Sequence, residues 1–164
     1  MKFLFNTMQI NKLYRQGVNA IIVDKDSNFL LVQKNTWQDN ILTIPGGGKE
    51  NDETPEENLF RELAEEIGAE KKDLIILGIS SHNIEYDYSI ELSSKINGGE
   101  YRGQSYKQFV VRFIGDKDKL IFTPKEFRNH KWVKAQELHK YLVLPNQYKT
   151  HKQAINEILP GIIQ

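Results

Sequence analysis

Three glutamates, Glu62, Glu65 and Glu66, lie within five residues of one another in the segment 46–70, GGGKENDETPEENLFRELAEEIGAE. At about 100° per residue, their side chains would fall on roughly one third of a helix circumference. Carboxylate oxygens are hard ligands that suit Mg²⁺ or Mn²⁺, and a divalent cation would offset the repulsion between them. The pattern therefore indicates a metal site, with a solvated acidic helix face as the alternative interpretation.

The sequence around these glutamates predicts a helix over Pro55–Ile67. Thr54 can cap the first turn, and Glu57 follows three residues later in a capping box, with proline at the first helical position. Gly68 suits the C-terminal cap, because glycine adopts the left-handed conformation without a steric penalty. The residues expected to be buried recur at helical spacing, and they are Leu59, Leu63 and Ile67.

A glycine-rich loop, with Gly46, Gly47 and Gly48 followed by Glu53, precedes the predicted helix. Glycine permits positive φ and close backbone approach, so this loop can wrap against the helix and bring it near a ligand. Considered alone, the loop has the composition of an ordinary strand-to-helix turn.

The rest of the chain alternates between predicted strands and helices. Segments with a strand pattern are residues 18–23 and 29–33, which form a hairpin, then 41–44, 73–81, 82–94, 105–115 and the start of 130–138. The turn signal NGG occupies residues 97–99, and a final helix is expected over 146–159, with Asn146 able to cap it. This order predicts an α/β (α+β) fold in which a sheet is sandwiched between helices.

Length and composition predict one globular domain over residues 1–164. The chain has 39% hydrophobic and 27% charged residues, and no low-complexity linker divides it. Because 22 basic residues balance 22 acidic ones, no overall attraction to DNA or to a membrane is expected. Any affinity for phosphate must be local, and the oligomeric state is left open.

The chain contains no cysteine, which excludes disulfides, thiolate metal sites and a cysteine nucleophile. The first residues, MKFLFNTMQI, lack the long apolar run and cleavage site of a signal peptide, and no later segment reaches the length of a membrane span. These features predict a cytoplasmic protein.

The spacing of Gly47, Glu53 and the run RELAEEIG over residues 61–68 resembles the signature box of Nudix hydrolases. Ala69 departs from the box, which usually ends in a bulky aliphatic residue, but this is a packing position. The resemblance implies a Nudix fold with a mixed sheet between helices. It also implies hydrolysis of a nucleoside diphosphate linked to another group.

The same resemblance implies a role for each acidic residue of the box. Glu65 and Glu66 match the principal metal ligands, and Glu62 matches a ligand or general base, so these three are the candidate catalytic residues. Arg61 and Glu53 match an ion pair that braces the loop against the helix, which suits the charged fork of arginine. The expected cofactor is Mg²⁺, with Mn²⁺ as the alternative.

The glycines of the box have implied roles as well. Gly47 and Gly68 are expected to be structural, and Gly46 is expected to contribute to the metal site. The segment TPKEFRNHKWV, residues 123–133, resembles a part of one Nudix branch that supplies a further glutamate to the metal. This resemblance assigns Glu126 to the metal site, with a solvated loop glutamate as the alternative.

The segment EYRGQSYKQFVVRF, residues 100–113, resembles a strand of the same branch, which cleaves diadenosine polyphosphates and removes pyrophosphate from RNA 5′ ends. The resemblance makes Tyr101, Gln104 and Lys107 candidate substrate-binding residues. A surface strand with an ordinary outward lysine is the alternative. Trp37, in the polar stretch KNTWQDN, is a candidate platform for stacking a base, with core packing as its alternative.

Two departures from that branch lie near the expected substrate region. Gln108 stands where the branch usually carries tryptophan, and PGGG at residues 45–48 stands where it usually carries Pro-Gln-Gly-Gly. The histidines show no metal-ligand spacing and are interpreted as incidental. The sequence has four of them, His82, His130, His139 and His151.

The leading prediction is a Mg²⁺-dependent pyrophosphohydrolase acting on dinucleoside polyphosphates or RNA 5′-triphosphate ends. The first alternative is a Nudix pyrophosphatase for (deoxy)nucleoside triphosphates or a nucleotide sugar. The second is a non-catalytic nucleotide-binding module, which would be free to lose the metal ligands that this chain retains.

Overall fold

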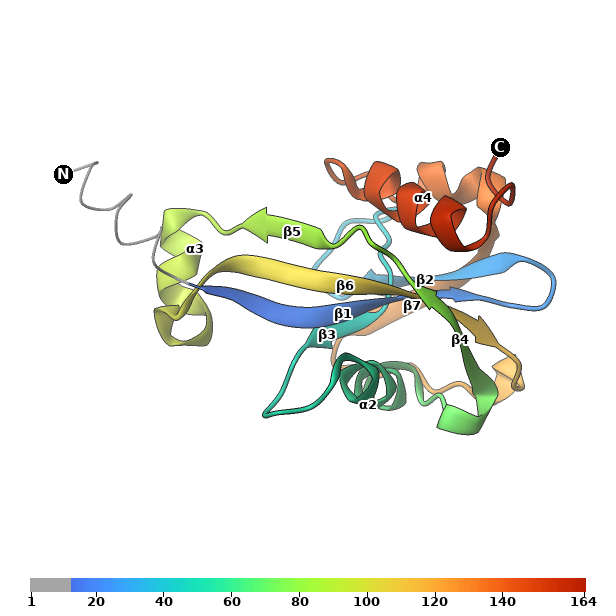
Figure 1. Cartoon of the computed structure of the whole chain (residues 1–164), viewed down its shortest axis with the longest axis horizontal. Helices are drawn as coiled ribbons and strands as arrows, with labels where there is room; N and C mark the ends of the chain where they lie inside the picture. Colours follow the sequence, from blue (N-terminus) through green and yellow to red (C-terminus); the bar gives the residue numbers. More distant parts are fainter. Residues whose placement is uncertain (1–12) are drawn as a thin grey trace.

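The structure of the protein, a computed structural model, describes residues 13–164 (Figure 1). Its strands are β1 (Leu13–Val23), β2 (Asn28–Lys34), β3 (Gly46–Gly48), β4 (Leu74–Ile79), β5 (Ile84–Asp87), β6 (Tyr101–Phe113) and β7 (Phe127–Lys134). Its α-helices are α2 (Pro55–Ile67), α3 (Ile90–Lys95) and α4 (Gln147–Ile158). Short 3-10 helices occupy Lys71–Asp73, Ile96–Gly99, Lys117–Lys119 and Ala135–Lys140.

All seven strands belong to one mixed sheet. Its order is β4-β6-β1-β2-β7, with β3 paired to β1 and β5 paired to β6. The long strands β1 and β6 run parallel, and the other pairs are antiparallel. Helix α2 lies against one face of the sheet and α4 against the other (Figure 1). The predicted α+β architecture, with a sheet between helices, is therefore confirmed.

One apolar cluster on each face holds these layers together. Alternation along β1 places Val18 and Ile22 in the cluster beneath α2, and Ile21 and Val23 in the cluster beneath α4. Strand β6 runs parallel beside β1, with one register shift between Leu13 and Tyr14, and alternates in the same way. Both faces are covered where these strands lie between α2 and α4, and there the sequence is apolar at successive positions, residues 20–23 in β1 and 109–111 in β6.

Helix α2 has the bounds that the sequence predicts. The Thr54 hydroxyl accepts a hydrogen bond from the Glu57 amide at 3.2 Å, and the Glu57 carboxylate accepts one from the Thr54 amide at 2.7 Å, which completes the capping box. Gly68 ends the helix in the left-handed conformation, with φ 65°. Within residues 13–164, no helix combines the length and hydropathy that a membrane span requires.

The predicted strand over residues 41–44 is wrong. Only Thr43 forms a bridge there, opposite Val32, and the strand next to β1 is the glycine run Gly46–Gly48. Strand β2 pairs with β1 only at its end, so the first half of β1 has a free edge, which β3 fills antiparallel. Glycine is required there because neighbouring side chains come too close for a Cβ atom.

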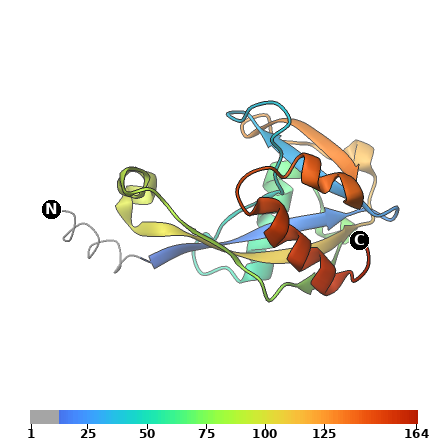
Figure 2. The ribbon, with the colours of Figure 1, turned by 90° about the horizontal axis from the view of Figure 1, so that it is seen from above.

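The prediction of a strand over residues 82–94 is also wrong in its second half. The strand β5 ends at Asp87, and Ser89 then caps the short helix α3 by accepting a hydrogen bond from the Leu92 amide at 3.2 Å. Strand β6 begins at Tyr101, before the predicted start at residue 105. Together, β5, α3 and the start of β6 extend away from the rest of the protein (Figure 2).

Helix α4 forms as predicted, but Asn146 does not cap it through its side chain. Asn146 adopts the left-handed conformation with φ 61°, and its side chain makes no capping hydrogen bond. The Gln147 side chain instead accepts a hydrogen bond from the Leu144 amide at 3.2 Å, which holds the preceding turn.

His151, interpreted from the sequence as incidental, has a defined partner in the core. It lies on α4, and its Nδ1 is 2.8 Å from Oε1 of Gln108 on β6, with both side chains buried. Gln108 stands where the resembled branch usually carries tryptophan, and it makes a polar contact between the sheet and α4. Burial disfavours the charged imidazolium and lowers the pKa of His151 to about 4.

This pKa predicts that acid destabilises the protein through His151. Between pH 6.5 and about 4, the unfolded chain binds a proton at this residue that the folded protein does not bind. The free energy of unfolding should therefore decrease as the pH falls below 6.5, by up to roughly 3 kcal/mol from this group alone. Urea denaturation at several pH values measures the dependence.

The matched comparison is His151→Asn, which keeps a polar group but cannot titrate in this range. Its unfolding free energy should change less between pH 6.5 and 4.5 than that of the wild type. Equal pH dependence in the two proteins would show that His151 does not carry the effect.

Candidate active site

A cleft of about 1140 Å³ is lined by side chains from β1, α2, β5, β6 and α4 and by the glycines of β3. Strands β1 and β6 contribute Arg15, Asn19, Gln104 and Tyr106, and the start of α4 lines the cleft as well. These four side chains lie on the face of the sheet that α4 covers, because they alternate with residues that pack toward α2. The cleft therefore lies on the α4 face of the sheet.

The carboxylates of α2 reach this cleft past the glycine strand. Glu62, Glu65 and Glu66 all line it, although α2 packs on the other face of the sheet. A Cβ atom on Gly47 would lie 2.4 Å from the Glu62 carboxylate, so any other residue here would displace that carboxylate from its present position. The absence of side chains on β3 thus opens the path from the helix to the cleft.

Glu66 is the most deeply buried of the three carboxylates, with 5% of its surface exposed. Its Oε2 accepts a hydrogen bond from the Gly46 amide at 2.9 Å. Burial, with the nearby carboxyl groups of Glu126 and Glu62, raises the pKa of Glu66 to about 9. Burial beside two other carboxyl groups therefore disfavours the ionised form of Glu66.

Glu126 approaches from a loop that is fastened to the end of α2. The Thr123 amide donates to the Glu66 carbonyl at 2.8 Å, and the Ile121 amide donates to the Ile67 carbonyl at 2.9 Å. From the other side, the Asn35 amide donates to the Glu126 carbonyl at 2.8 Å. These backbone contacts hold the Glu126 side chain in the cleft beside Glu66.

Arg61 links the carboxylates to the glycine loop. It binds Glu53 through two hydrogen bonds, Nε to Oε2 at 3.0 Å and Nη2 to Oε1 at 2.7 Å, and Nη2 also donates to the Gly48 carbonyl at 2.9 Å. Its Nη1 lies 2.9 Å from Glu62 Oε1 and 3.2 Å from Glu65 Oε2. One guanidinium group therefore donates hydrogen bonds to three carboxylates, and a fourth, Glu50, lies 3.8 Å from its Nε.

The electrostatic effects of this network differ between the carboxylates. Hydrogen bonds from Arg61 lower the pKa of Glu53 and thereby keep it ionised. Burial raises the pKa of Glu62, although Arg61 opposes the shift. The pKa of Arg61 itself rises, mainly because of Glu53, so Arg61 stays charged.

The comparisons with known proteins agree with this arrangement. The sequence profile of the NUDIX domain matches residues 13–157. The chain belongs to the NUDIX domain family. One relative, named RNA pyrophosphohydrolase, from Zymomonas mobilis, is 34% identical over 135 residues, covering 81% of this chain and 87% of the relative. A protein of the same name from Sphingopyxis alaskensis is 32% identical over 149 residues, covering 90% and 94%.

Solved Nudix structures share the fold. A C. elegans Ap4A hydrolase binary complex superposes with a TM-score of 0.64 and 19% identity, covering 85% of this chain and 93% of that one. The E. coli dihydroneopterin triphosphate pyrophosphohydrolase superposes with a TM-score of 0.65 and 18% identity, covering 90% and 99%. At such identities the likeness concerns the fold, and the predicted Nudix fold is confirmed.

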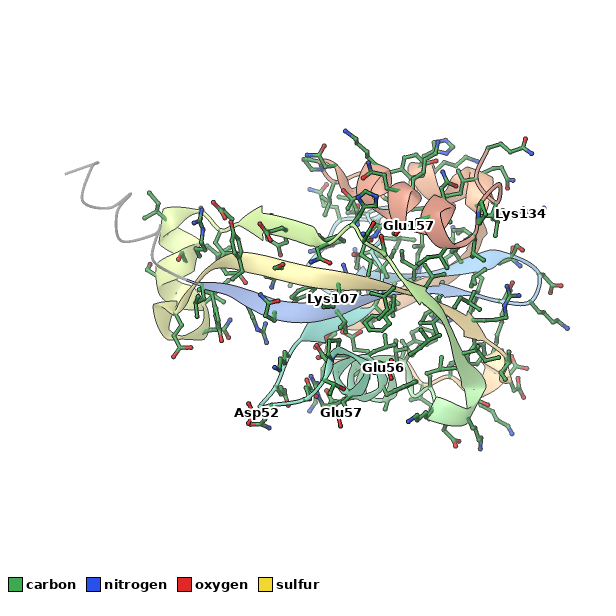
Figure 3. The ribbon with its side chains drawn as sticks, in the orientation of Figure 1. Asp52, Glu56, Glu57, Lys107, Lys134 and Glu157 are labelled. Atoms are coloured by element: carbon green, nitrogen blue, oxygen red, sulfur yellow. The ribbon has the colours of Figure 1, made fainter. Side chains whose placement is uncertain are left out.

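The structure brings some of the predicted substrate-binding residues into the cleft but not others. Trp37 and Gln104 line it. Lys107, labelled in Figure 3, pairs with Val18 and so faces the α2 side of the sheet, and it does not line the cleft. Tyr101 pairs with Leu13 at the far end of β6 and is also absent from the lining. The phosphate contacts expected of Lys107 and Tyr101 are not supported by this placement.

Two other residues of the cleft were not identified from the Nudix sequence motifs. Arg15 is half-buried and makes no ion pair among the described residues, so its charge is available to a ligand in the cleft. Tyr106 packs over Gly17, and burial raises the pKa of Tyr106 to about 12, which keeps its hydroxyl neutral. Period-two alternation places Arg15, Gly17 and Asn19 on one face of β1, but only the β1–β6 pairing shows that this face lines the cleft.

Nudix hydrolases generally use divalent metal ions such as Mg²⁺. No group of three or more His, Cys, Asp or Glu side chains among residues 13–164 could by itself hold a metal ion. Mg²⁺ suits an open set of ligands, because it binds through one or two carboxylates and retains waters or substrate phosphates. Glu66 fits such an ion, since it is buried beside Glu62 and Glu126 and its surroundings hold too little positive charge.

The Arg61 network generates a prediction for Arg61→Lys. Lysine keeps the positive charge but cannot form two parallel hydrogen bonds with Glu53 while it contacts the Gly48 carbonyl. The affinity for Mn²⁺, measured by isothermal titration calorimetry, should fall by about 10- to 100-fold, because the carboxylates lose their orientation.

The matched control is Arg102→Lys, which disrupts a similar pair of hydrogen bonds to Asp87 outside the cleft. Circular dichroism should show that both variants retain the fold. Equal Mn²⁺ affinity in Arg61→Lys and Arg102→Lys would contradict the role of Arg61 in orienting the carboxylates.

Proposed function

We propose that this protein is a Mg²⁺-dependent pyrophosphohydrolase that cleaves a nucleoside polyphosphate. The observation that carries the proposal is the convergence of Glu62, Glu65, Glu66 and Glu126 on a cleft that is also lined by Arg15, which makes no ion pair within residues 13–164. Such a cleft can attract both a divalent cation and the phosphates of a nucleotide.

Glu62, Glu65, Glu66 and Glu126 are the carboxylates that would hold the cation, one or two of them at a time beside waters or substrate phosphates, with Gly46 contributing from the loop. When bound, the ion supplies charge neutralisation for the polyphosphate and lowers the pKa of a bound water. Arg61 and Glu53 keep the carboxylates oriented through the contacts already described. Gly46 donates its amide to Glu66, so its contribution in this structure is to position that carboxylate.

The substrate class that we propose is a dinucleoside polyphosphate or the 5′-triphosphate end of RNA. Relatives at 34% and 32% identity carry the name RNA pyrophosphohydrolase, and they support the second choice. The cleft also extends from the carboxylates to Trp37, which offers an aromatic face for a base. Its volume of about 1140 Å³ exceeds what a mononucleotide needs.

Among the residues of the cleft, we assign phosphate binding to Arg15 and base or sugar contacts to Trp37 and Gln104. The half-buried guanidinium of Arg15 lies on the cleft floor, where a phosphate is the ligand that matches its fork of donors. Lys107 and Tyr101 keep their predicted roles only as expectations for the substrate-bound protein.

The alternative substrates are a (deoxy)nucleoside triphosphate or a nucleotide sugar, which the same carboxylates could process. A non-catalytic nucleotide-binding module is less compatible with the retained set of carboxylates and with Arg61. We further propose that residues 1–164 act as a single domain and that the protein works in the cytoplasm, as its sequence predicts.

The proposal predicts the outcome of a hydrolysis panel with Mg²⁺ and a dinucleoside tetraphosphate, 5′-triphosphate RNA, the deoxynucleoside triphosphates and ADP-ribose. The wild type should prefer the dinucleoside tetraphosphate or the RNA, and the former should yield a mononucleotide and a triphosphate. Glu65→Gln should lose about 100-fold or more of this activity, because a neutral amide cannot replace a charged metal ligand.

Glu56→Gln is the matched control, since Glu56 lies exposed on the same helix and outside the cleft (Figure 3). It should retain wild-type activity. Preference for a simple nucleotide by a wide margin would favour the alternative enzyme, and binding without turnover in either Mg²⁺ or Mn²⁺ would favour the binding module.

A further inference from the structure

A buried polar contact joins three elements beneath one wall of the cleft. Gln108 on β6 has 0% of its surface exposed, and its Oε1 lies 2.8 Å from Nδ1 of His151 on α4. The Gln108 Nε2 donates to the His82 carbonyl at 2.7 Å, in the segment that connects β4 to β5. One amide side chain therefore fastens both α4 and the β4–β5 connection to the central sheet.

A second contact joins the same two peripheral elements directly. Glu157, near the end of α4, accepts hydrogen bonds from the Ser80 hydroxyl at 2.7 Å and from the Ser81 amide at 3.0 Å. The Ser80 hydroxyl in turn accepts a hydrogen bond from the His82 amide at 3.0 Å. The connection over residues 80–82 is thus held by α4 at one end and by Gln108 at the other.

The two elements that meet at this contact both line the cleft. Asn83, Glu85 and Tyr86 follow directly after the fastened connection, and Lys149 and Gln153 flank His151 on α4. These side chains come from α4 and from the segment 83–86, whereas Glu62, Glu65 and Glu66 come from α2. The contact thus fastens one side of the cleft and includes none of the candidate metal ligands.

The chemistry of the pair favours a positional role over simple core packing. Apolar side chains would fill a space between a helix and a sheet without the cost of burying polar groups. Gln108 is instead satisfied on both sides of its amide, and each hydrogen bond restricts direction as well as distance. A fully satisfied buried polar contact specifies one arrangement of the elements that it joins.

We propose that Gln108 and His151 are a positioning pair that fixes the α4 and β5 sides of the cleft for the part of the substrate that lies away from the cleavage site. The proposal rests on the proposed function, because it assumes a substrate long enough to reach these sides. It predicts that the pair affects the binding of long substrates and leaves the chemistry at the α2 carboxylates intact.

The test uses His151→Phe, which keeps an aromatic ring but removes the ring nitrogen that contacts Gln108. Gln108→Met is a second test variant of similar length that removes both hydrogen bonds of the amide. His151→Asn is the rescue variant, because its amide can replace the ring nitrogen next to Gln108. Val111→Ala is the matched control, since Val111 is buried on β6 but belongs to the cluster on the α2 face.

Steady-state kinetics with a dinucleoside tetraphosphate and with a nucleoside triphosphate give the first readout. Either test variant should raise KM for the long substrate by about tenfold, because the α4 and β5 sides of the cleft would no longer be held in the arrangement that binds it. Both kcat and the kcat/KM for the short substrate should stay within about twofold of wild type. His151→Asn should restore KM for the long substrate. Val111→Ala should leave the ratio of kcat/KM between the long and the short substrate unchanged.

Amide hydrogen exchange of residues 82–86 gives a second readout that needs no turnover. Exchange should accelerate in the test variants and not in Val111→Ala. Unchanged exchange in the test variants, or equal losses of kcat/KM for the long and the short substrate, would overturn the proposal. A wild-type protein that hydrolyses neither substrate would instead contradict the proposed function, and the exchange of residues 82–86 would then decide for or against the positioning pair.

Discussion

Helix α2 can present its carboxylates to the cleft only because the strand beside them has no side chains. The Glu62 carboxylate occupies the space that a Cβ atom on Gly47 would take, and the Gly46 amide donates to Glu66. The same strand offers the Gly48 carbonyl to Arg61. A side chain at Gly47 would displace the Glu62 carboxylate from its position, and one at Gly48 would displace the Arg15 guanidinium.

This close approach is costly for the folded protein in the absence of a cation. It buries Glu62 and Glu66 near each other, and burial raises the pKa of both groups. Arg61 offsets part of the repulsion by contacting Glu53, Glu62 and Glu65 but not Glu66. Such unrelieved electrostatic cost is typical of functional sites, where the ligand supplies the missing charge.

The sequence predicts those parts of the structure that depend on local interactions. Helix α2 has its predicted bounds because its cap, first turn and C-terminal glycine are all encoded within the segment. The glycine strand β3 was not predicted, since its existence depends on the free edge of β1, which is distant in sequence. Helix α3 was missed for a different reason, because residues 82–94 have a strand-like pattern and yet the cap at Ser89 starts a helix.

The candidate site follows the same division. The acidic residues and Arg61 belong to one motif, so their types and spacing indicate their chemistry before the fold is known. Arg15 and His151 were missed because only the parallel pairing of β1 with β6 and the packing of α4 place them at the cleft. Lys107 was predicted to bind substrate but does not line the cleft, because its register on β6 places it on the α2 face of the sheet.

The proposal that Glu66 helps to hold a divalent cation is tested most directly by calorimetric titration of Mn²⁺ into metal-free protein. Wild type and Glu56→Gln should bind the ion alike, and Glu66→Gln should bind it about 100-fold more weakly or not at all. Wild-type affinity in Glu66→Gln would contradict the account, because the cation would then be held elsewhere.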